Sequence, residues 1–137
     1  MVIDSSAIVA ILLGERERES FVDAIVGAEV VRMSAATFVE TSMILESRHG
    51  AEGILLLDRW LDDAGIEVIA VDAAQAKIAR QAFSDYGQGR HRAGLNFGDC
   101  FTYALARRFG EPLLSKGDDF PRTDLAMADV RPSGRDG

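Results

Sequence analysis

Short apolar runs alternate with longer segments of helical periodicity along most of this chain. Such a run, when polar residues bound it, is typical of a buried strand. The runs are residues 1–4, 30–33, 66–71 and 112–115. Strands that alternate with helices are joined by helical crossovers, which bring them side by side in the same direction. The pattern therefore predicts an α/β domain with a mostly parallel sheet.

The segments between these runs have the periodicity and the start signals of helices. Helices are predicted over residues 6–13, 15–26, 34–49, 51–64, 72–86 and 96–109. Ser5, Ser34 and Asp72 can each accept a hydrogen bond from a backbone N–H in the first turn of a helix. Val26 and Leu56 share the apolar stripes of their helices, so we expect both in the core.

Length and composition fit a single domain. The chain has 137 residues, of which 47% are hydrophobic and 27% charged, as in globular proteins. We expect one domain over residues 1–137, with a frayed polar tail at 132–137. The longest apolar stretch, residues 7–13, is too short to cross a membrane, and the first residues lack the basic start of a signal peptide. A cytoplasmic protein is therefore expected.

The sequence has one cysteine and two histidines. Cys100 has no partner for an internal disulfide, which agrees with a reducing compartment. His49 and His91 are too dispersed to form a zinc site with it. A metal ion bound by this chain must therefore have oxygen ligands.

The net charge of −7 argues against a nucleic-acid partner. Two considerations weaken that argument. Acids gathered around a divalent ion lose their mutual repulsion when the ion binds. The basic residues are also concentrated in the second half of the chain, for example Arg90, Arg92 and Lys116. These basic residues either form an RNA-binding surface or are ordinary solvated side chains.

Two acids interrupt apolar segments. Asp4 ends the first apolar run and directly precedes the apolar segment 7–13. Glu40 has Met43 and Ile44 among its helical neighbours, so it lies on a face expected to pack inward. Burying a carboxylate without a partner costs several kcal/mol. Asp4 could instead cap a helix, and Glu40 could reach solvent or pair with an arginine.

Further acids stand near strand ends or helix starts. Asp99 lies in the first turn of its helix, where the helix dipole alone favours an acid. Asp118 and Asp119 follow the last apolar run, where a turn would also explain them.

Taken together, the acids form one pattern. Asp4, Asp99 and Asp118 lie on the side of the sheet where ligands bind in open α/β folds, and Glu40 can reach it from a helix. Converging carboxylates raise one another's pKa values unless a cation is bound. Hard oxygen ligands suit Mg²⁺ or Mn²⁺, which serve in-line displacement at phosphorus.

These residues resemble the VapC-type PIN-domain toxins. The resemblance rests on residues 2–7, on Glu40-Thr41, on 94–101 and on 112–120, and it extends from Met1 to about Val130. It implies a three-layer α/β/α sandwich around a mostly parallel sheet, and an endoribonuclease that uses Mg²⁺ or Mn²⁺.

The resemblance also implies the site residues. Asp4, Glu40 and Asp99 match the acidic metal-binding core, and Asp118 is the better match for the fourth acid. Its neighbour Asp119 remains the alternative. Ser6 matches a small hydroxyl residue that orients water or phosphate. Arg90, Arg92 and Lys116 are our candidates for holding RNA.

Two partners follow from the resemblance. One is a second copy in a homodimer. The other is a VapB-like antitoxin, whose basic segment would cover the acidic groove and whose apolar side chains would pack between helices near Phe21 and Met43. A free-standing PIN nuclease without antitoxin and a PIN fold retained as a non-catalytic RNA-binding module stay open as alternatives.

Other folds with an acid after the first strand fit less well. A haloacid-dehalogenase-type phosphatase needs a second Asp two residues after Asp4, and that position is Ser6. A receiver domain needs its Asp after a middle strand, and there Asp72 has the pattern of a helix cap. No glycine fingerprint for a dinucleotide follows the first run.

Overall fold

The computed structural model describes residues 1–132. Its four strands form one parallel sheet in the order β3–β2–β1–β4. They are β1 (Val2–Ile3), β2 (Arg32–Ser34), β3 (Glu67–Ile69) and β4 (Leu113–Leu114). Each strand is shorter than the apolar run that predicts it. The chain moves outward from β1 to β3 and then returns to place β4 on the other side of β1. This reversal creates a switch point between β1 and β4, where α/β folds bind ligands.

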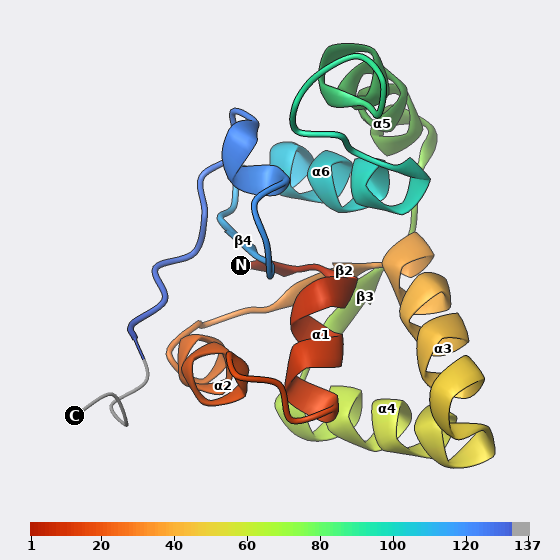
Figure 1. Ribbon diagram of the computed structural model, residues 1–137, viewed down its shortest axis with the longest axis vertical. Coiled ribbons are helices and arrows are strands. Elements are labelled where there is room, and N and C mark those ends of the chain that lie inside the picture. Colours follow the sequence, from red (N-terminus) through yellow and green to blue (C-terminus); the bar gives the residue numbers. More distant parts are fainter. Residues whose placement is uncertain (133–137) are drawn as a thin grey trace.

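Two helices connect each strand to the next. They are α1 (Ser5–Leu12), α2 (Arg18–Val26), α3 (Ala35–His49), α4 (Ala51–Ala64), α5 (Ala73–Tyr86) and α6 (Phe97–Phe109), followed by a 3₁₀ turn η1 (Phe120–Arg122). Figure 1 shows α5 and α6 on one side of the sheet and α1, α2 and α4 on the other, with α3 extending away on that second side. The expected three-layer arrangement around a parallel sheet is confirmed.

The core has two parts because neighbouring residues of a strand point to opposite faces. Ile3 packs in the cluster under α1, α2, α3 and α4, whereas Val2 packs in the cluster under α5 and α6. Leu114 and Leu113 divide in the same way on β4. All four side chains are at most 1% exposed. The central strands are thus buried on both faces, as expected of a parallel sheet.

The polar residues at the helix starts mostly act as predicted. Ser34, Asp72 and Asn96 cap α3, α5 and α6 with their side-chain oxygens. The prediction for α1 is one residue off, because Asp4 rather than Ser5 caps it and the helix begins at Ser5.

Two predictions about the core are wrong. Val26 is 79% exposed and Leu56 is 42% exposed. The apolar stripe of α2 is wider than the surface against which this short helix packs, so Phe21 and Ile25 are buried and Val26 is not. Leu56 faces a groove that is described below.

The expected polar tail at residues 132–137 lies almost wholly outside the described part of the chain. Within residues 1–132, no helix has the length and apolar character needed to cross a membrane.

Candidate functional site

Asp4 lies at the switch point of the sheet, between the end of β1 and the start of α1. Its side chain is 3% exposed, and its backbone N–H donates to the carbonyl of Leu114 on β4 (3.0 Å). The carboxylate accepts one hydrogen bond on each oxygen, from the backbone N–H of Ser6 onto Oδ2 (3.1 Å) and from the hydroxyl of Thr102 onto Oδ1 (2.8 Å). Asp4 is therefore both a helix cap and a buried carboxylate held from two sides.

Glu40 reaches the same region from α3. The hydroxyl of Ser5 donates to its Oε1 (2.9 Å). Its carboxylate also lies against the first turn of α6, in the space that a Cβ on Gly98 would occupy. A helix N-terminus favours a negative charge. Glu40 thus connects α3 with the N-terminal ends of α1 and α6.

Asp99 forms a reciprocal cap with Asn96 at the start of α6. The backbone N–H of Asn96 donates to Asp99 Oδ2 (3.0 Å), and the N–H of Asp99 donates to Asn96 Oδ1 (2.9 Å). Burial, against the lowering effect of the Asn96 N–H and with smaller contributions from the charges of Asp4, Glu40 and Asp119, raises the pKa of Asp99 to about 7. Asp4 and Glu40 are therefore close enough for their negative charges to act on Asp99.

The effect of neighbouring charges on the pKa of Asp99 also bears on the choice between Asp118 and Asp119 as the fourth acid. Both Asp118 and Asp119 are exposed in the turn after β4. The charge of Asp119, but not that of Asp118, is among the causes that raise the pKa of Asp99. Asp119 is thus the candidate with structural support, and Asp118 remains the candidate that the resemblance favours.

The donor set fits a divalent cation. Each oxygen of Asp4 keeps a lone pair beyond its one hydrogen bond, and a cation would relieve the repulsion that raises the pKa of Asp99. Within residues 1–132, no three acidic, histidine or cysteine side chains stand close enough to hold an ion by direct contact alone. An ion that keeps several of its waters, as Mg²⁺ does, suits this spacing.

Sequence reasoning missed three residues of this site. Ser5 and Thr102 donate to carboxylates, and Gly98 leaves the space for Glu40. Thr102 lies three residues after Asp99, on the same side of a helix, which was the available signal. Hydroxyl residues within a helix carry no pattern that distinguishes them from ordinary core threonines.

Two of the proposed substrate-binding residues meet beside Asp4. The backbone N–H of Lys116 donates to the hydroxyl of Ser6 (2.9 Å). The ammonium of Lys116 pairs with Glu15 (2.7 Å) and Glu17 (3.3 Å), in the turn between α1 and α2. These hydrogen bonds and charges raise the pKa of Lys116. Its positive charge is thus largely balanced by neighbours.

The two arginines lie elsewhere, in the loop between α5 and α6. Arg90 stacks over the ring of Phe83 (5.3 Å), and the carbonyl of Arg92 accepts from Arg122 (3.3 Å). Both side chains are exposed in this loop.

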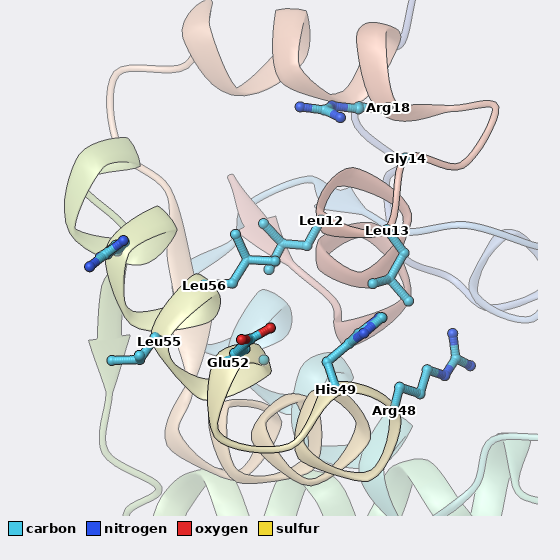
Figure 2. Close-up of a pocket in the computed structure, with 11 residues that line it drawn as sticks. Leu12, Leu13, Gly14, Arg18, Arg48, His49, Glu52, Leu55 and Leu56 are labelled. Atoms are coloured by element: carbon cyan, nitrogen blue, oxygen red, sulfur yellow. The ribbon is translucent and has the colours of Figure 1, made fainter.

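A groove of about 910 Å³ opens between α1, α2, α3 and α4, on the side of the sheet that faces away from α5 and α6. In Figure 2, Leu12 and Leu56 point toward each other across it, Leu13 points toward His49, and Arg18 and Arg48 stand at its rim. Its other charged or titratable lining residues are His49, Glu52 and Arg59. Cations therefore outnumber acids around an apolar floor, in a chain whose net charge is −7. We refer to this surface as the leucine groove.

The two residues near which an antitoxin is expected to pack, Phe21 and Met43, differ in exposure, and neither lines the leucine groove. Phe21 is 5% exposed and belongs to the core. Met43 is 63% exposed but does not line the groove. The helical pattern identified the apolar residues of α2 and α3 but not which of them pack within the fold.

Exposed apolar side chains flank the contact between Glu40 and Gly98. Val39 (54% exposed) directly precedes Glu40 on α3, Met43 (63%) lies three residues after it, and Phe97 (79%) directly precedes Gly98 on α6. Phe97 packs edge-on against Phe101, and both line an apolar cleft of about 390 Å³ between α5 and α6. The contact between Glu40 and Gly98 holds α3 and α6 together at this point. We refer to Val39, Met43, Phe97 and Phe101 as the phenylalanine surface.

Comparison with known proteins identifies the family. The model of the PIN domain matches residues 1–125. This chain belongs to the PIN-domain family. Ribonuclease VapC30 of Mycobacterium tuberculosis (strain H37Rv) is 50% identical over 126 residues, which cover 92% of this chain and 96% of that protein. Ribonuclease VapC of Mycolicibacterium smegmatis is 52% identical over 126 residues, with 92% and 98% covered. Within the PIN family, the chain therefore belongs to the VapC group, as the sequence resemblance predicts.

Solved structures of low sequence identity share the fold. VapC20 of Mycobacterium tuberculosis, described as a toxin that cleaves the sarcin-ricin loop, has a TM-score of 0.75 at 18% identity, with 91% of this chain and 95% of that chain covered. A chain of the VapBC2 complex of Rickettsia felis has a TM-score of 0.73 at 12% identity, with 93% and 96% covered. These likenesses confirm the PIN-like α/β/α architecture.

Proposed function

We propose that this chain is the toxin of a type II toxin–antitoxin system and acts as a metal-dependent endoribonuclease. The carrying observation is the placement of Asp4, Glu40 and Asp99 near the switch point of the sheet, where the charges of Asp4 and Glu40 contribute to the raised pKa of Asp99. The naming of its half-identical relatives as VapC ribonucleases supports RNA as the substrate. The single cysteine, which is free and buried, supports action in a reducing compartment such as the cytoplasm.

We refer to Asp4, Glu40, Asp99 and the Asp118–Asp119 pair as the acidic cluster, and we propose that it binds the metal ion. Asp4 and Asp99 hold Mg²⁺ or Mn²⁺ together with Glu40 and one acid of the Asp118–Asp119 pair. When bound, the ion supplies Lewis acidity that activates water for in-line displacement at phosphorus. The hydroxyl of Ser6 accepts from the N–H of Lys116, so its own hydrogen is free to donate to a phosphate oxygen.

RNA is held through its backbone by cations outside the cluster. Arg90 and Arg92 stand on an exposed loop, and loop cations of this kind bind phosphates in a salt-dependent way. Changing both to Glu should weaken binding to many RNAs alike. Arg59→Glu with Arg131→Glu makes the same charge change away from that loop and is the matched control.

A VapB-like antitoxin is the proposed partner. Among the structural neighbours are a toxin–antitoxin complex from Klebsiella pneumoniae and VapBC2 from Rickettsia felis. In this chain, the leucine groove suits an amphipathic segment with leucine-sized anchors and acidic side chains facing Arg18 and Arg48. A basic side chain farther along the same partner would pair with Asp4 or Asp99 and exclude the ion.

A homodimer is the proposed assembly, with the phenylalanine surface as its interface. Exposed aromatic and aliphatic side chains that gather beside an apolar cleft are typical of protein interfaces. Phe97 of one copy could enter the cleft between α5 and α6 of the other. A reduced mass of the Phe97→Asp variant in solution would support this assembly.

One experiment tests the proposed function. Purified protein is incubated with total RNA in Mg²⁺, in Mn²⁺ and with a chelator, alongside the Asp4→Asn variant. Cleavage that requires the metal and falls by orders of magnitude in the variant is expected. Undiminished cleavage in chelator would overturn metal dependence. Metal-independent RNA binding without cleavage would indicate a binding module instead.

Expression in cells tests whether an antitoxin exists. Expression of this chain should arrest growth, and co-expression of the neighbouring reading frame should relieve the arrest and yield a co-purifying complex. Arrest that no neighbouring product relieves would indicate a free-standing PIN nuclease.

A further inference from the structure

We infer that Thr102, supported by Thr37, is a positioning residue that orients the carboxylate of Asp4 for the cation. The inference rests on the proposed function and adds two residues to its site. Thr102 lies on α6 and is 1% exposed, and its hydroxyl donates to Asp4 Oδ1 at 2.8 Å. Neither threonine is among the residues proposed to bind the ion directly.

The two hydroxyls form a chain with a fixed direction. Thr37 Oγ1 lies 3.0 Å from Thr102 Oγ1, and Thr37 is also 1% exposed. A hydroxyl has one hydrogen to donate. Because Thr102 donates its hydrogen to Asp4, Thr37 must be the donor in the contact between the two threonines. Solvent does not reach either side chain, so the order Thr37, Thr102, Asp4 is set by the fold.

This chain determines how Asp4 presents its oxygens. The N–H of Ser6 holds Oδ2 at 3.1 Å, and Thr102 holds Oδ1 at 2.8 Å. Two donors on opposite oxygens fix the rotation of the carboxylate plane. Each oxygen still has a lone pair for a cation. Partners that orient a metal-binding carboxylate in this manner typically change metal affinity by roughly ten- to a hundredfold when they are removed.

The positioning residues share their helices with the other acids. Thr37 lies three residues before Glu40 on α3, and Thr102 lies three residues after Asp99 on α6. A shift of α3 relative to α6 would therefore move Thr37 together with Glu40, and would separate Thr37 from Thr102. The Thr37–Thr102 contact stabilises one relative position of the two helices at the site.

Thr102→Val tests the inference because it replaces the hydroxyl with a methyl group of similar size. Thr102→Ser retains the hydroxyl. Thr41→Val is the matched control, since Thr41 is fully buried on α3 and its hydroxyl donates to the backbone carbonyl of Thr37 (2.8 Å) and not to the chain leading to Asp4. For each full-length variant we would measure the affinity for Mn²⁺ alone by calorimetry, the melting temperature, and kcat and KM for RNA cleavage.

Thr102→Val should weaken Mn²⁺ binding by roughly ten- to a hundredfold and lower kcat with little change in KM. Thr102→Ser should restore both, and Thr41→Val should lower the melting temperature while Mn²⁺ affinity stays unchanged. Thr37→Val, one bond farther from Asp4, should have a smaller effect of the same kind, and it serves as the test if Thr102→Val does not fold.

Two contrary outcomes are distinguishable. If the wild type binds Mn²⁺ and cleaves RNA but the position-102 and position-37 variants match Thr41→Val in Mn²⁺ affinity and kcat, the inference alone is overturned. If the wild type neither binds Mn²⁺ nor cleaves RNA, the proposed function is overturned and the inference with it.

Discussion

The carboxylate of Glu40 occupies the space that a side chain on Gly98 would need. The glycine lies in the first turn of α6 with an ordinary helical backbone, so the absence of a Cβ, and not a special conformation, is what this position requires. Glu40 can therefore approach α6 closely enough for its charge to act on Asp99.

Gly98→Ala should move Glu40 out of the site. The displaced group is the end of a flexible side chain, so the fold should survive and the melting temperature should change little. Misplacing a reacting group by about 1 Å can cost on the order of a hundredfold in rate, and we expect a loss of that size in RNA cleavage. Gly27→Ala is the control, because a Cβ there meets its nearest atom at an ordinary 3.5 Å. Full activity in Gly98→Ala would show that Glu40 is dispensable.

Because the pKa of Asp99 is raised, the metal-free protein should become less stable as the pH rises. The folded state holds the proton of Asp99 up to about pH 7, whereas the ordinary pKa of an aspartic acid is 3.8. Above pH 7 the folded protein must bear the unfavourable charge, so stability is lost as the pH rises from about 4 to 7. Asp99→Asn should therefore melt higher than the wild type at pH 8 in chelator, with an advantage that shrinks toward pH 5.

Mg²⁺ or Mn²⁺ should reverse this difference at pH 8, because the ion stabilises the charged wild-type site and has less to bind in the amide variant. Thermal melts of both proteins in chelator and in metal would decide the point. An advantage of Asp99→Asn that is the same at every pH would argue against a raised pKa.

Because Lys116 pairs with Glu15 and Glu17, we expect these two acids to lower the affinity for RNA. The double change Glu15→Gln and Glu17→Gln removes two negative charges and frees the ammonium beside Ser6. RNA affinity should rise, and the slope of log K against log salt should steepen by about one for one additional phosphate contact. Asp58→Asn with Asp62→Asn makes the same charge change on α4 and should leave the slope unchanged. Equal slopes in both double variants would mean that Lys116 does not contact RNA.

The leucine groove predicts a variant that separates inhibition from catalysis. Leu56→Glu places a charge on the apolar floor at a position that is already 42% exposed, so the fold should tolerate it. Antitoxin binding should weaken roughly ten- to a hundredfold, because burying a leucine is worth about 1.5–3 kcal/mol. RNA cleavage by the isolated protein should be unchanged. Val26→Glu, at a position that is 79% exposed outside the groove, is the control. Normal inhibition of Leu56→Glu would place the antitoxin elsewhere.

The order of elements could be predicted from sequence because local chemistry specifies it. Apolar runs gave the strands, and Ser34, Asp72 and Asn96 marked helix starts that the structure confirms. The width of each helix surface that meets the core could not be predicted from the pattern alone. Met43 and Val26 continue apolar stripes but remain exposed, because a stripe does not show how much of its width a neighbouring element covers.

The acids of the site could be proposed from the sequence, but the residues that form hydrogen bonds and ion pairs around them could not. Asp4, Glu40 and Asp99 stood out because charges are unusual at apolar positions. Thr102 did not, since its partner is 98 positions away in the chain. The pairing of Lys116 with Glu15 spans 101 positions, and no local pattern predicts it.

The place of β1 between β2 and β4 has a consequence for synthesis on the ribosome. β1 is made first, but its neighbour β4 is more than a hundred residues later, and Asp4 donates its backbone N–H to Leu114 of that strand. While the chain is growing, the first strand lacks its partner on one side and the acids that flank it have no fixed arrangement. The proposed site can therefore be complete only after β4 has left the exit tunnel, and we expect a nascent chain to cleave no RNA until then.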